Sequence, residues 1–415
     1  MIRLLVVGAG DRGSIYARWA AAHPGRARVV GIAEPIEARR ERLAAELGVP
    51  RENLFADWRE ALARPRFADA AIVATLDHQH ADPAVALAEA GHHLLLEKPM
   101  APTVTECERI VDAVRRAGVL FAVGHVLLYT PFTRRLRELL AAGRIGDLVT
   151  LDRLEPVGWW HFAHSYVRGN WRREEDSSFL LLTKACHDLD WIRAIMDEPC
   201  VAVSSFGSLR HFRPEARPAE AGDARRCLDC DFEPRCPYSA PRLYEGMLAL
   251  GWRGWPVSVL SDDPDEASVR SALESGPYGR CVYDCDNDVV DHQVVLLRFA
   301  SGRTASFTVT AFTAYGFDRK TRLFGSRGSI EGDGVRLDVT DFVSGQTESL
   351  RVGSGDVLEE GAHGGGDAGL MDAFVRAVEE GRGDALLSGP EETLESHRIV
   401  FAAERARREG RVVEL

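Results

Sequence analysis

The sequence has no apolar stretch near the ~18 residues that a membrane-spanning helix needs, and no basic run longer than three residues. Lys and Arg number 51 against 63 Asp and Glu, which gives a formal net charge of −12. Nucleic acids and anionic membranes attract basic surfaces, so this charge balance argues against both as partners. We therefore expect a small-molecule partner.

The first residues lack the charged, apolar and small-residue zones of a secretory signal. We therefore expect a cytoplasmic protein. In a reducing compartment the eight cysteines are expected to be thiols or metal ligands rather than a disulfide framework. A chain of 415 residues is long enough for two or three domains with cores of their own.

Short apolar runs alternate with helical patterns through the first 124 residues. The runs cover residues 2–7, 29–33, 70–74 and 94–96, and amphipathic stretches separate them. This rhythm predicts a parallel sheet with helices on both faces, an α/β domain spanning residues 1–124.

A complete G-x-G-x-x-G motif lies between the first strand and the first helix of this domain. Its first glycine permits a tight turn, its second lets the backbone approach a pyrophosphate, and its third lets helix and strand pack closely. The helix N-terminus that follows favours an anion. The motif therefore predicts a dinucleotide-binding site, whose expected ligands here are Gly8, Gly10, Asp11, Arg12 and Gly13.

Glu34 closes the second strand, 21 residues after the last glycine of the motif. A carboxylate at this place accepts hydrogen bonds from the adenosine ribose and repels a 2′-phosphate, so NAD is favoured over NADP. Arg39 and Arg40 follow closely and weaken that preference.

Two further motifs, Thr75-Leu76-Asp77-His78-Gln79-His80 and Glu97-Lys98-Pro99, resemble those of the glucose-fructose oxidoreductase and inositol dehydrogenase family, known as Gfo/Idh/MocA. The resemblance implies a Rossmann domain followed by an α+β domain, residues 125–415, with a large and mainly antiparallel sheet. It also implies that Thr75, His80, Glu97 and Lys98 contact the cofactor, and that the bond before Pro99 is cis.

Lys98 follows a parallel strand, so it is expected at the crevice where cofactors bind in open α/β sheets. An amine beside a nicotinamide can exchange a proton with a carbinol while a hydride moves to the ring. We therefore predict Lys98 to be the catalytic acid and base.

The segment 159–171 is dense in aromatic, imidazole and guanidinium groups and poor in aliphatic ones. Flat aromatic faces suit sugar or cyclitol rings, and polar side chains there would bind hydroxyls or a carboxylate. We predict that His164, Arg168 and Trp171 bind substrate. A loop that caps the sheet, or an oligomer interface, is the alternative.

Residues 181–191 predict a helix with Lys184, His187, Asp188 and Trp191 on one face. The resembled family has an aspartate four residues before this histidine; here that position is Thr183, and the basic residue that many relatives carry near 126–129 is also missing. We expect His187 to bind substrate and assist Lys98, with Lys184 as a substitute cation. Either proton transfer is arranged differently or the substrate is acidic.

A cysteine-rich insertion covers about residues 207–286. Its C-x2-C-x5-C pattern and a later cysteine predict a tetrahedral structural zinc site in a segment without an apolar core of its own. An iron–sulfur cluster is the less favoured alternative. The predicted ligands are Cys227, Cys230, Cys236 and Cys281, with Cys285 competing for the fourth place.

Residues 289–299 and 304–312 flank Ala300-Ser301-Gly302-Arg303 in a hairpin pattern, and 323–339 predicts further strands. In the resembled family the free face of such a sheet commonly pairs with another subunit, so a homo-oligomer is expected. His363-Gly364-Gly365-Gly366-Asp367 resembles a family loop near the substrate.

Together these features predict an NAD-dependent oxidoreductase that moves hydride between a sugar, cyclitol or related polyol carbinol and nicotinamide. One alternative is a glycosidase that holds NAD permanently and works by transient oxidation and elimination. A dinucleotide sensor without catalysis is a third interpretation, which the polar wall around Lys98, Lys184 and His187 argues against.

Overall fold

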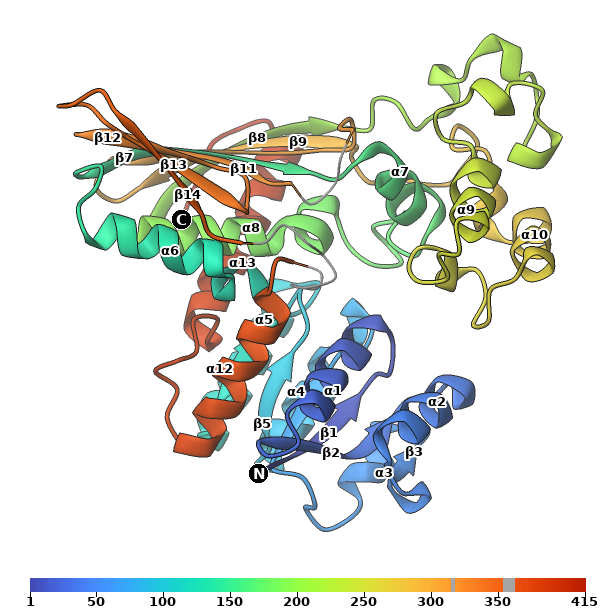
Figure 1. The fold of residues 1–415 in the computed structure, drawn as a ribbon, viewed down its shortest axis with the longest axis horizontal. Helices are drawn as coiled ribbons and strands as arrows, with labels where there is room; N and C mark the ends of the chain where they lie inside the picture. Colours follow the sequence, from blue (N-terminus) through green and yellow to red (C-terminus); the bar gives the residue numbers. More distant parts are fainter. Residues whose placement is uncertain (315–317, 354–362) are drawn as a thin grey trace.

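The computed structural model describes residues 1–314, 318–353 and 363–415, and it contains two sheets joined end to end through a buried junction (Figure 1). None of the helices in these ranges is both long and apolar enough to span a bilayer.

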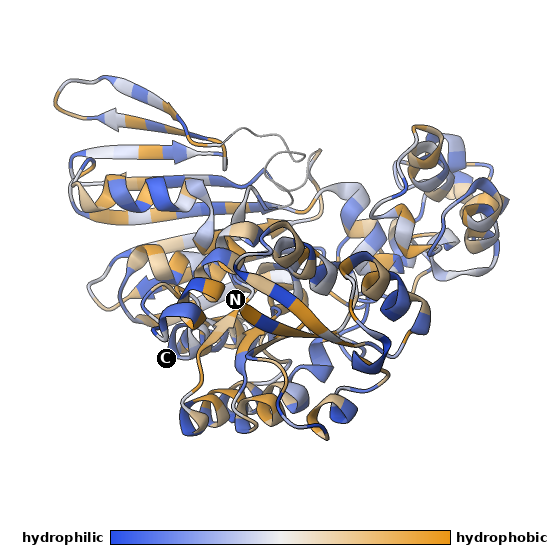
Figure 2. Cartoon of the chain, turned by 60° about the horizontal axis from the view of Figure 1, so that its bottom comes forward, coloured by the Kyte–Doolittle hydropathy of each residue, from blue (hydrophilic) through white to orange (hydrophobic). Residues whose placement is uncertain are grey.

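The N-terminal sheet has the strand order β3-β2-β1-β4-β5-β6, and every pair in it is parallel. Its central strands are buried and apolar throughout, which is why they read as continuous runs and appear orange in Figure 2. The predicted parallel α/β domain is confirmed. Its strands are β1 (Ile2–Val7), β2 (Ala27–Ala33), β3 (Leu54–Phe55), β4 (Ala70–Val73), β5 (His93–Leu96) and β6 (Phe121–Val123). Its helices are α1 (Asp11–Ala22), α2 (Glu37–Leu47), α3 (Trp58–Leu62), α4 (Ala81–Glu89) and α5 (Val104–Ala117).

The second sheet has nine strands in the order β14-β13-β12-β11-β7-β10-β9-β8-β15. Only β7 and β10 pair in parallel, so the predicted mainly antiparallel sheet is confirmed. Its strands are β7 (Leu148–Pro156), β8 (Cys200–Ser208), β9 (His292–Phe299), β10 (Thr304–Thr310), β11 (Lys320–Gly325), β12 (Gly328–Gly332), β13 (Arg336–Asp341), β14 (Thr347–Arg351) and β15 (Val413–Glu414).

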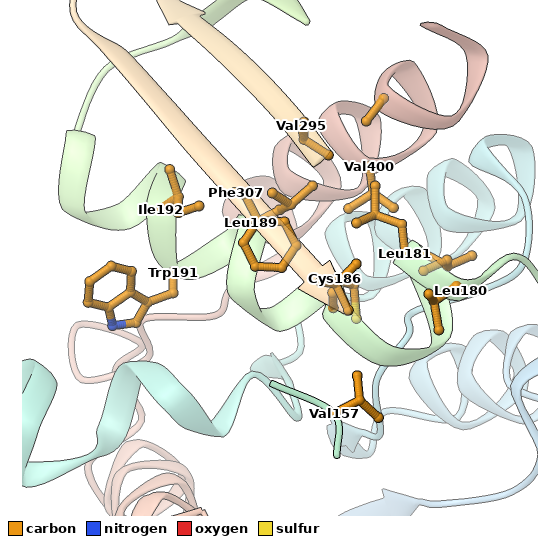
Figure 3. Close-up of a cluster of buried hydrophobic side chains, with 14 of the residues drawn as sticks. Val157, Leu180, Leu181, Cys186, Leu189, Trp191, Ile192, Val295, Phe307 and Val400 are labelled. Atoms are coloured by element: carbon orange, nitrogen blue, oxygen red, sulfur yellow. The ribbon is translucent and has the colours of Figure 1, made fainter. Parts of the chain in front are cut away.

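Helices cover one face of this sheet, and the main core lies between them. Along β9 the buried residues Val295 and Leu297 alternate with the exposed Val294 and Leu296, so only one face is packed. Figure 3 shows Val295 and Phe307 from the sheet meeting side chains of the covering helices. The helices of this part of the chain are α6 (Pro131–Ala141), α7 (Trp159–Phe162), α8 (Leu180–Met196), α12 (Gly366–Glu380) and α13 (Pro390–Glu409).

The insertion between β8 and β9 projects beyond the sheet (Figure 1) and has a small core of its own. Two helices, α9 (Ala240–Ala249) and α10 (Glu266–Ser275), pack Tyr244 against Val269 and Leu273. The expectation that this segment lacks an apolar core is therefore wrong. The insertion therefore does not need a metal ion as a substitute for an apolar core.

A buried ion pair lies at the junction of the two domains. His125 follows β6, and its Nδ1 is 3.0 Å from Oδ2 of Asp190 on α8, with both side chains fully buried. Burial alone would lower the pKa of His125, but the Asp190 carboxylate raises it to about 10. This imidazole is therefore protonated in the folded chain at neutral pH.

The raised pKa makes the stabilisation pH-dependent. In the unfolded chain a histidine titrates near pH 6.5, so the pair's contribution is complete below that pH and is lost as pH rises through about 10. We predict that His125→Gln lowers stability by about 3–5 kcal/mol at pH 6, and that the melting-temperature difference from the wild type shrinks toward pH 10.

His92→Gln is the matched control, because burial lowers the pKa of His92 and this side chain stays neutral in both states above pH 7. Its effect on the melting temperature should not change between pH 7 and pH 10. A His125→Gln difference that is equally constant would contradict the charged pair.

Candidate active site

In the glycine-rich loop after β1, two glycines lie in close contact with backbone atoms and one faces open space. Gly8 has φ of +96°, and a Cβ there would lie 2.4 Å from the Ala74 carbonyl oxygen. A Cβ on Gly13 would lie 1.9 Å from the Gly8 carbonyl oxygen, whereas one on Gly10 would meet nothing within 4 Å. The first and third glycines are thus needed for packing, and the middle one leaves room for a ligand against the backbone.

Glu34 is held at the end of β2 beside this loop. Its carboxylate accepts hydrogen bonds from the backbone N–H of Ala9 at 2.8 Å and of Ile36 at 3.0 Å. Arg40 donates to the Glu34 carbonyl, and Arg39 lies 4.0 Å from Asp262 of the insertion. The fixed carboxylate and the loop suit the ribose and pyrophosphate of a dinucleotide.

The Thr75 hydroxyl is a further group that a cofactor could satisfy. It is buried, follows β4, and has no hydrogen-bond partner among the described residues. A buried hydroxyl without a partner is costly unless a ligand satisfies it. His80 braces the same loop, with Nδ1 2.8 Å from the Pro99 carbonyl and Nε2 3.2 Å from the Thr75 carbonyl.

Arg12 points from the glycine-rich motif toward the end of β5 and toward α12. It donates to Glu97 Oε1 at 2.7 Å, to the Tyr16 hydroxyl at 2.6 Å and to Asp367 Oδ1 at 2.5 Å. Burial would raise the pKa of Glu97, but the Arg12 guanidinium and Lys98 lower it, so the carboxylate is ionised. Arg12 therefore joins the cofactor loop to the second domain, while Asp11 is exposed as the first residue of α1.

Lys98 reaches across the junction from β5 to α8. The Lys98–Pro99 bond is cis, and Nζ donates a hydrogen bond to the Thr183 carbonyl oxygen at 2.7 Å. Thr183 occupies the position where the resembled family has an aspartate. In this chain Lys98 contacts the backbone carbonyl of that residue rather than a side-chain carboxylate.

His187 lies one turn further along α8 and is a neutral imidazole. Burial lowers its pKa well below the usual value. Arg319 NH2 lies 2.9 Å from Nε2, closer than the 3.2 Å to Asp188 Oδ2, and a guanidinium can only donate. The proton must therefore sit on Nδ1, which is buried without a partner among the described residues and is free to donate to a ligand oxygen.

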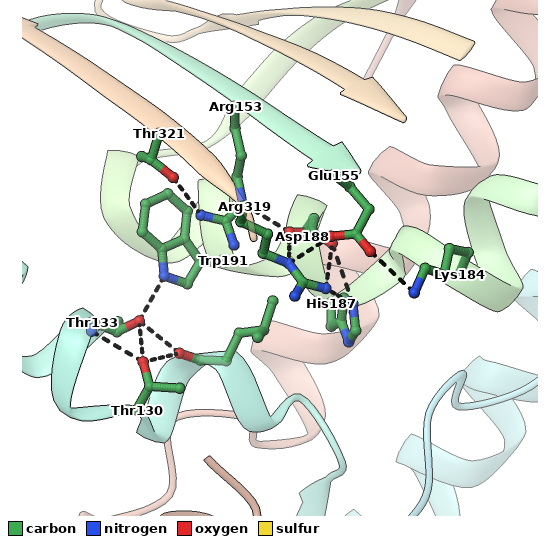
Figure 4. Close-up of polar contacts among 11 residues, drawn as sticks. Thr130, Thr133, Arg153, Glu155, Lys184, His187, Asp188, Trp191, Arg319 and Thr321 are labelled. Carbon is green, nitrogen blue, oxygen red and sulfur yellow. Dashed lines mark hydrogen bonds and ion pairs between the residues drawn. The ribbon is translucent and has the colours of Figure 1, made fainter. Parts of the chain in front are cut away.

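Three cations and two carboxylates lie around this imidazole (Figure 4). Arg319 Nε lies 2.8 Å from both Glu155 Oε2 and Asp188 Oδ1, and Arg153 Nε is also 2.8 Å from Asp188 Oδ1. Lys184 Nζ lies 3.0 Å from Glu155 Oε1, and burial lowers its pKa. The pocket therefore carries more positive than negative charge.

Two of the residues predicted to bind substrate in 159–171, His164 and Arg168, contact the insertion. His164 Nδ1 is 2.8 Å from the Tyr244 hydroxyl, and its ring stacks on Tyr278, both in the insertion. Arg168 donates to the carbonyls of Arg280 and Tyr238, so its described hydrogen bonds also go to the insertion. A substrate contact for these two side chains stays a prediction.

Trp171 is half-buried beside Tyr166, with ring centroids 6.3 Å apart. The segment itself is α7 followed by a π-helical turn, Ala163–Arg168, rather than a loop. His161 from this segment was not predicted as a site residue. It is buried against Trp255 of the insertion, with ring centroids 4.9 Å apart, and burial together with the positive charge of Lys184 lowers its pKa well below normal.

His363 also faces the site. Its ring lies 6.3 Å from that of His187, and its Nδ1 is 3.1 Å from Asp367 Oδ2. Asp367 also accepts a hydrogen bond from Arg12. A chain of hydrogen bonds therefore runs from the glycine-rich loop through Asp367 to His363, whose ring lies beside His187.

Cys186 lies in a buried cluster with two histidines, His125 and His397. Within the described ranges, the only three side chains whose metal-binding atoms all lie within 4.8 Å are His125, Cys186 and His397. His397 has both ring nitrogens engaged, by the Met100 N–H and the Thr393 carbonyl, and His125 is protonated. This cluster is packing rather than a metal site.

The predicted zinc ligands instead line one cavity in the insertion without closing on a single point. The cavity wall includes Cys227, Cys230, Cys236 and Cys281, while Cys285 Sγ turns to the Cys281 carbonyl at 3.2 Å.

The first domain has a parallel sheet with a glycine-rich first turn, and the second has a mainly antiparallel sheet whose helix α8 contacts Lys98. This combination defines a two-domain dinucleotide-dependent oxidoreductase. Family models match both parts: an oxidoreductase-family NAD-binding Rossmann fold over residues 2–125 and an oxidoreductase-family C-terminal alpha/beta domain over residues 137–415. The chain belongs to the Gfo/Idh/MocA family of NAD-dependent oxidoreductases, as its motifs predicted.

Individual relatives are distant. A levoglucosan dehydrogenase of Pseudarthrobacter phenanthrenivorans is 25% identical over 348 residues, 80% of this chain and 76% of the relative. A 2,7-anhydro-N-acetylneuraminate hydratase of Escherichia coli is 28% identical over 215 residues, 52% of this chain and 55% of the relative. An Agrobacterium radiobacter oxidoreductase, solved with NAD+, L-tartaric acid and magnesium, superposes with a TM-score of 0.72 at 15% identity, covering 100% of this chain and 98% of that one.

The open space at Gly10 gives a direct test of the cofactor site. We predict that Gly10→Val folds normally, because a side chain there meets no protein atom, but weakens NAD binding at least ~10-fold by filling the place of the pyrophosphate. Isothermal titration with NAD measures the change.

Gly25→Val is the control, since Gly25 also has open space around it but lies in the turn before β2. NAD affinity should be unchanged there. Equal NAD affinity in Gly10→Val and the wild type would contradict the placement of the cofactor.

Proposed function

We propose that the chain catalyses NAD-dependent hydride transfer between nicotinamide and a carbinol carbon of a sugar, cyclitol or related polyol. The observation that carries the proposal is the contact of Lys98 with the Thr183 carbonyl, beside the free Nδ1–H of His187. A movable proton donor and acceptor and a fixed hydrogen-bond donor thus lie together at the carboxyl end of β5, where the cofactor crevice is expected.

NAD, bound through the glycine-rich loop and Glu34, would accept the hydride at the nicotinamide ring. In its unprotonated form Lys98 Nζ takes the hydroxyl proton of the substrate, and the protonated amine returns it in the reverse direction. His187 donates Nδ1–H to the same or the neighbouring oxygen and stays neutral, because Arg319 occupies Nε2. It therefore positions the carbinol rather than exchanging the proton.

The charge of the pocket favours an acidic substrate among these compounds. Lys98, Lys184, Arg153, Arg319 and Arg12 bring five positive charges, while Glu155, Asp188, Glu97 and Asp367 bring four negative charges, so one positive charge is unbalanced. A buried excess of positive charge is costly unless an anion compensates it. A carboxylate on the sugar would supply that charge, so we propose sugar acids as the first compounds to examine.

A second candidate function uses the same groups. In a glycosidase that retains NAD, oxidation of a carbinol acidifies the adjacent C–H, a base removes that proton, and the leaving group departs before water addition and re-reduction. The hydratase of Escherichia coli supports this alternative, because its name implies water addition to an anionic anhydro sugar.

Absorbance at 340 nm separates the two functions. The protein is incubated with NAD and a panel of neutral sugars, inositols, sugar acids and aryl glycosides. Steady growth of NADH with one compound supports the dehydrogenase, and faster growth with sugar acids supports the charge argument. Release of an aryl group without net NADH supports the glycosidase, and silence with every compound would contradict both.

We predict that Lys98→Met lowers kcat at least ~1000-fold while NAD affinity changes little, because the variant removes the group that carries the proton. The chain has only two other lysines, and Lys320 lies exposed on β11, so Lys320→Met is a matched control that should retain full activity. Unchanged turnover in folded Lys98→Met would overturn the assignment.

We also propose that the chain is a homo-oligomer through the open face of the large sheet. Phe206 is 66% exposed and Leu296 51% exposed, and Val294 lies across from Phe206 in the β8–β9 pair. Neighbouring exposed apolar side chains on one sheet face are typical of a subunit interface.

Light scattering after size-exclusion chromatography tests this interface. Leu296→Glu should shift the wild-type assembly to smaller species, because a carboxylate would be buried without a partner. Val343→Glu, in an exposed turn, should leave the mass unchanged. A monomeric wild-type protein would contradict the proposal.

A further inference from the structure

The cysteine-lined cavity of the insertion is formed by segments far apart in the sequence. A bridge pairs Arg226 with Arg280, and the Cys281 N–H donates to the Arg225 carbonyl at 2.8 Å. This pairing brings Cys227 and Cys281, separated by 54 positions, to the same cavity wall.

The other two cysteines reach the cavity through short turns. The Cys230 N–H donates to the Cys227 carbonyl at 3.3 Å, and a following turn carries Cys236, whose own N–H donates to the Glu233 carbonyl at 3.0 Å. Tight backbone turns that present two nearby thiols are typical of thiolate metal sites. The remaining wall consists of apolar and aromatic side chains and of two charged residues, Arg226 and Glu233, and the Glu233 carboxylate accepts a hydrogen bond from Ser239. The apolar and aromatic residues are Ala221, Phe232, Val282 and Tyr283.

A buried cation points into the same cavity. Arg168 is 1% exposed, and its NH2 lies 3.4 Å from Cys227 Sγ. No carboxylate of the described residues lies within ion-pair distance of this guanidinium, and its NH1 is buried without a partner there. A buried charge is normally paired, so negative charge is missing from this site when the cysteines are neutral thiols.

We propose that Cys227, Cys230, Cys236 and Cys281 hold a metal centre as thiolates, and that its negative charge balances Arg168. Four thiolates around one zinc ion, or around an iron–sulfur cluster, give a net negative group. A bound metal deprotonates its cysteine ligands, so the negative charge that Arg168 lacks would come from the thiolates themselves.

The spacing of the sulfurs favours a cluster as the occupant. A zinc ion with Zn–S bonds of about 2.3 Å draws its four sulfurs to ~3.8 Å from one another. Among the described residues, the insertion cysteines do not form a group of three close metal-binding atoms like the one at His125, Cys186 and His397. The four cysteines line the cavity wall, so a zinc ion would require their sulfurs to move closer together, whereas a larger iron–sulfur core holds its ligands further apart.

The centre would fix the wall next to the catalytic pocket. Arg168 ends the π-helical turn that also contains Tyr166, and the Tyr166 hydroxyl lies near the side chain of Thr183. Thr183 in turn accepts from Lys98. The metal centre has a positioning role in this arrangement, and no electron transfer through it is required.

Metal and sulfide analysis of the full-length protein tests the proposal. Protein purified without chelators and without oxygen is analysed for iron, zinc and acid-labile sulfide, and its visible spectrum is recorded. Iron with matching sulfide and broad absorption near 400 nm identifies a cluster; about one zinc per chain and no colour identifies a zinc centre. Either result supports a thiolate-held metal, and less than ~0.1 of any metal per chain overturns it.

Variants show whether the named cysteines are the ligands. Cys230→Ser should lose most of the metal, and Cys200→Ser, a buried cysteine of β8 outside the insertion, should retain all of it. Because Cys230→Ser could fail to fold, alkylation of the native wild type gives an independent result. The four ligands should resist iodoacetamide until the metal is removed, and rapid alkylation of all four in the untreated folded protein would contradict coordination.

Discussion

The burial of positive charge at the domain junction is the constraint on which the rest of this structure depends. Lys98 comes from the end of a parallel strand, Lys184 from α8, and Arg319 from the segment before β11. Lys184 and Arg319 are buried and Lys98 is half-buried, and the two carboxylates of Glu155 and Asp188 balance only two of these three charges. This excess of positive charge is the basis for proposing an anionic substrate. Arg319 already engages Nε2 of His187, which leaves Nδ1 as the nitrogen that can donate to a ligand.

Helix α8 is the element that makes this arrangement possible. It is buried along nearly its whole length, which is unusual for a helix with four charged side chains, and it presents Asp190 to His125 on one side and His187 to Arg319 on another. Because this ion pair and this hydrogen bond connect α8 to both domains, the helix holds Thr183 at a fixed distance from Lys98. Catalytic geometry and domain docking thus depend on the same contacts.

Much of this fold could be predicted from the sequence, because its signals are local. The glycine motif followed by Glu34 predicted the first domain, and the 3.6-residue spacing predicted α8 with Lys184 and His187 on it. Arg319 and Glu155 could not be found this way, because each lies in a strand or loop without a motif and reaches the site only through tertiary packing. The core of the insertion did carry a local signal, the four-residue spacing of Ala240 and Tyr244, and of Val269 and Leu273.

The most direct test of the account is the fate of a carbinol hydrogen in a single turnover. A substrate from the positive panel, deuterated at the carbinol carbon, is mixed with NAD and excess enzyme, quenched, and the nicotinamide is analysed by mass spectrometry. The account predicts deuterium on the reduced nicotinamide in the wild type and none in Lys98→Met. Product formed without any deuterated nicotinamide would contradict hydride transfer as the chemistry of this site.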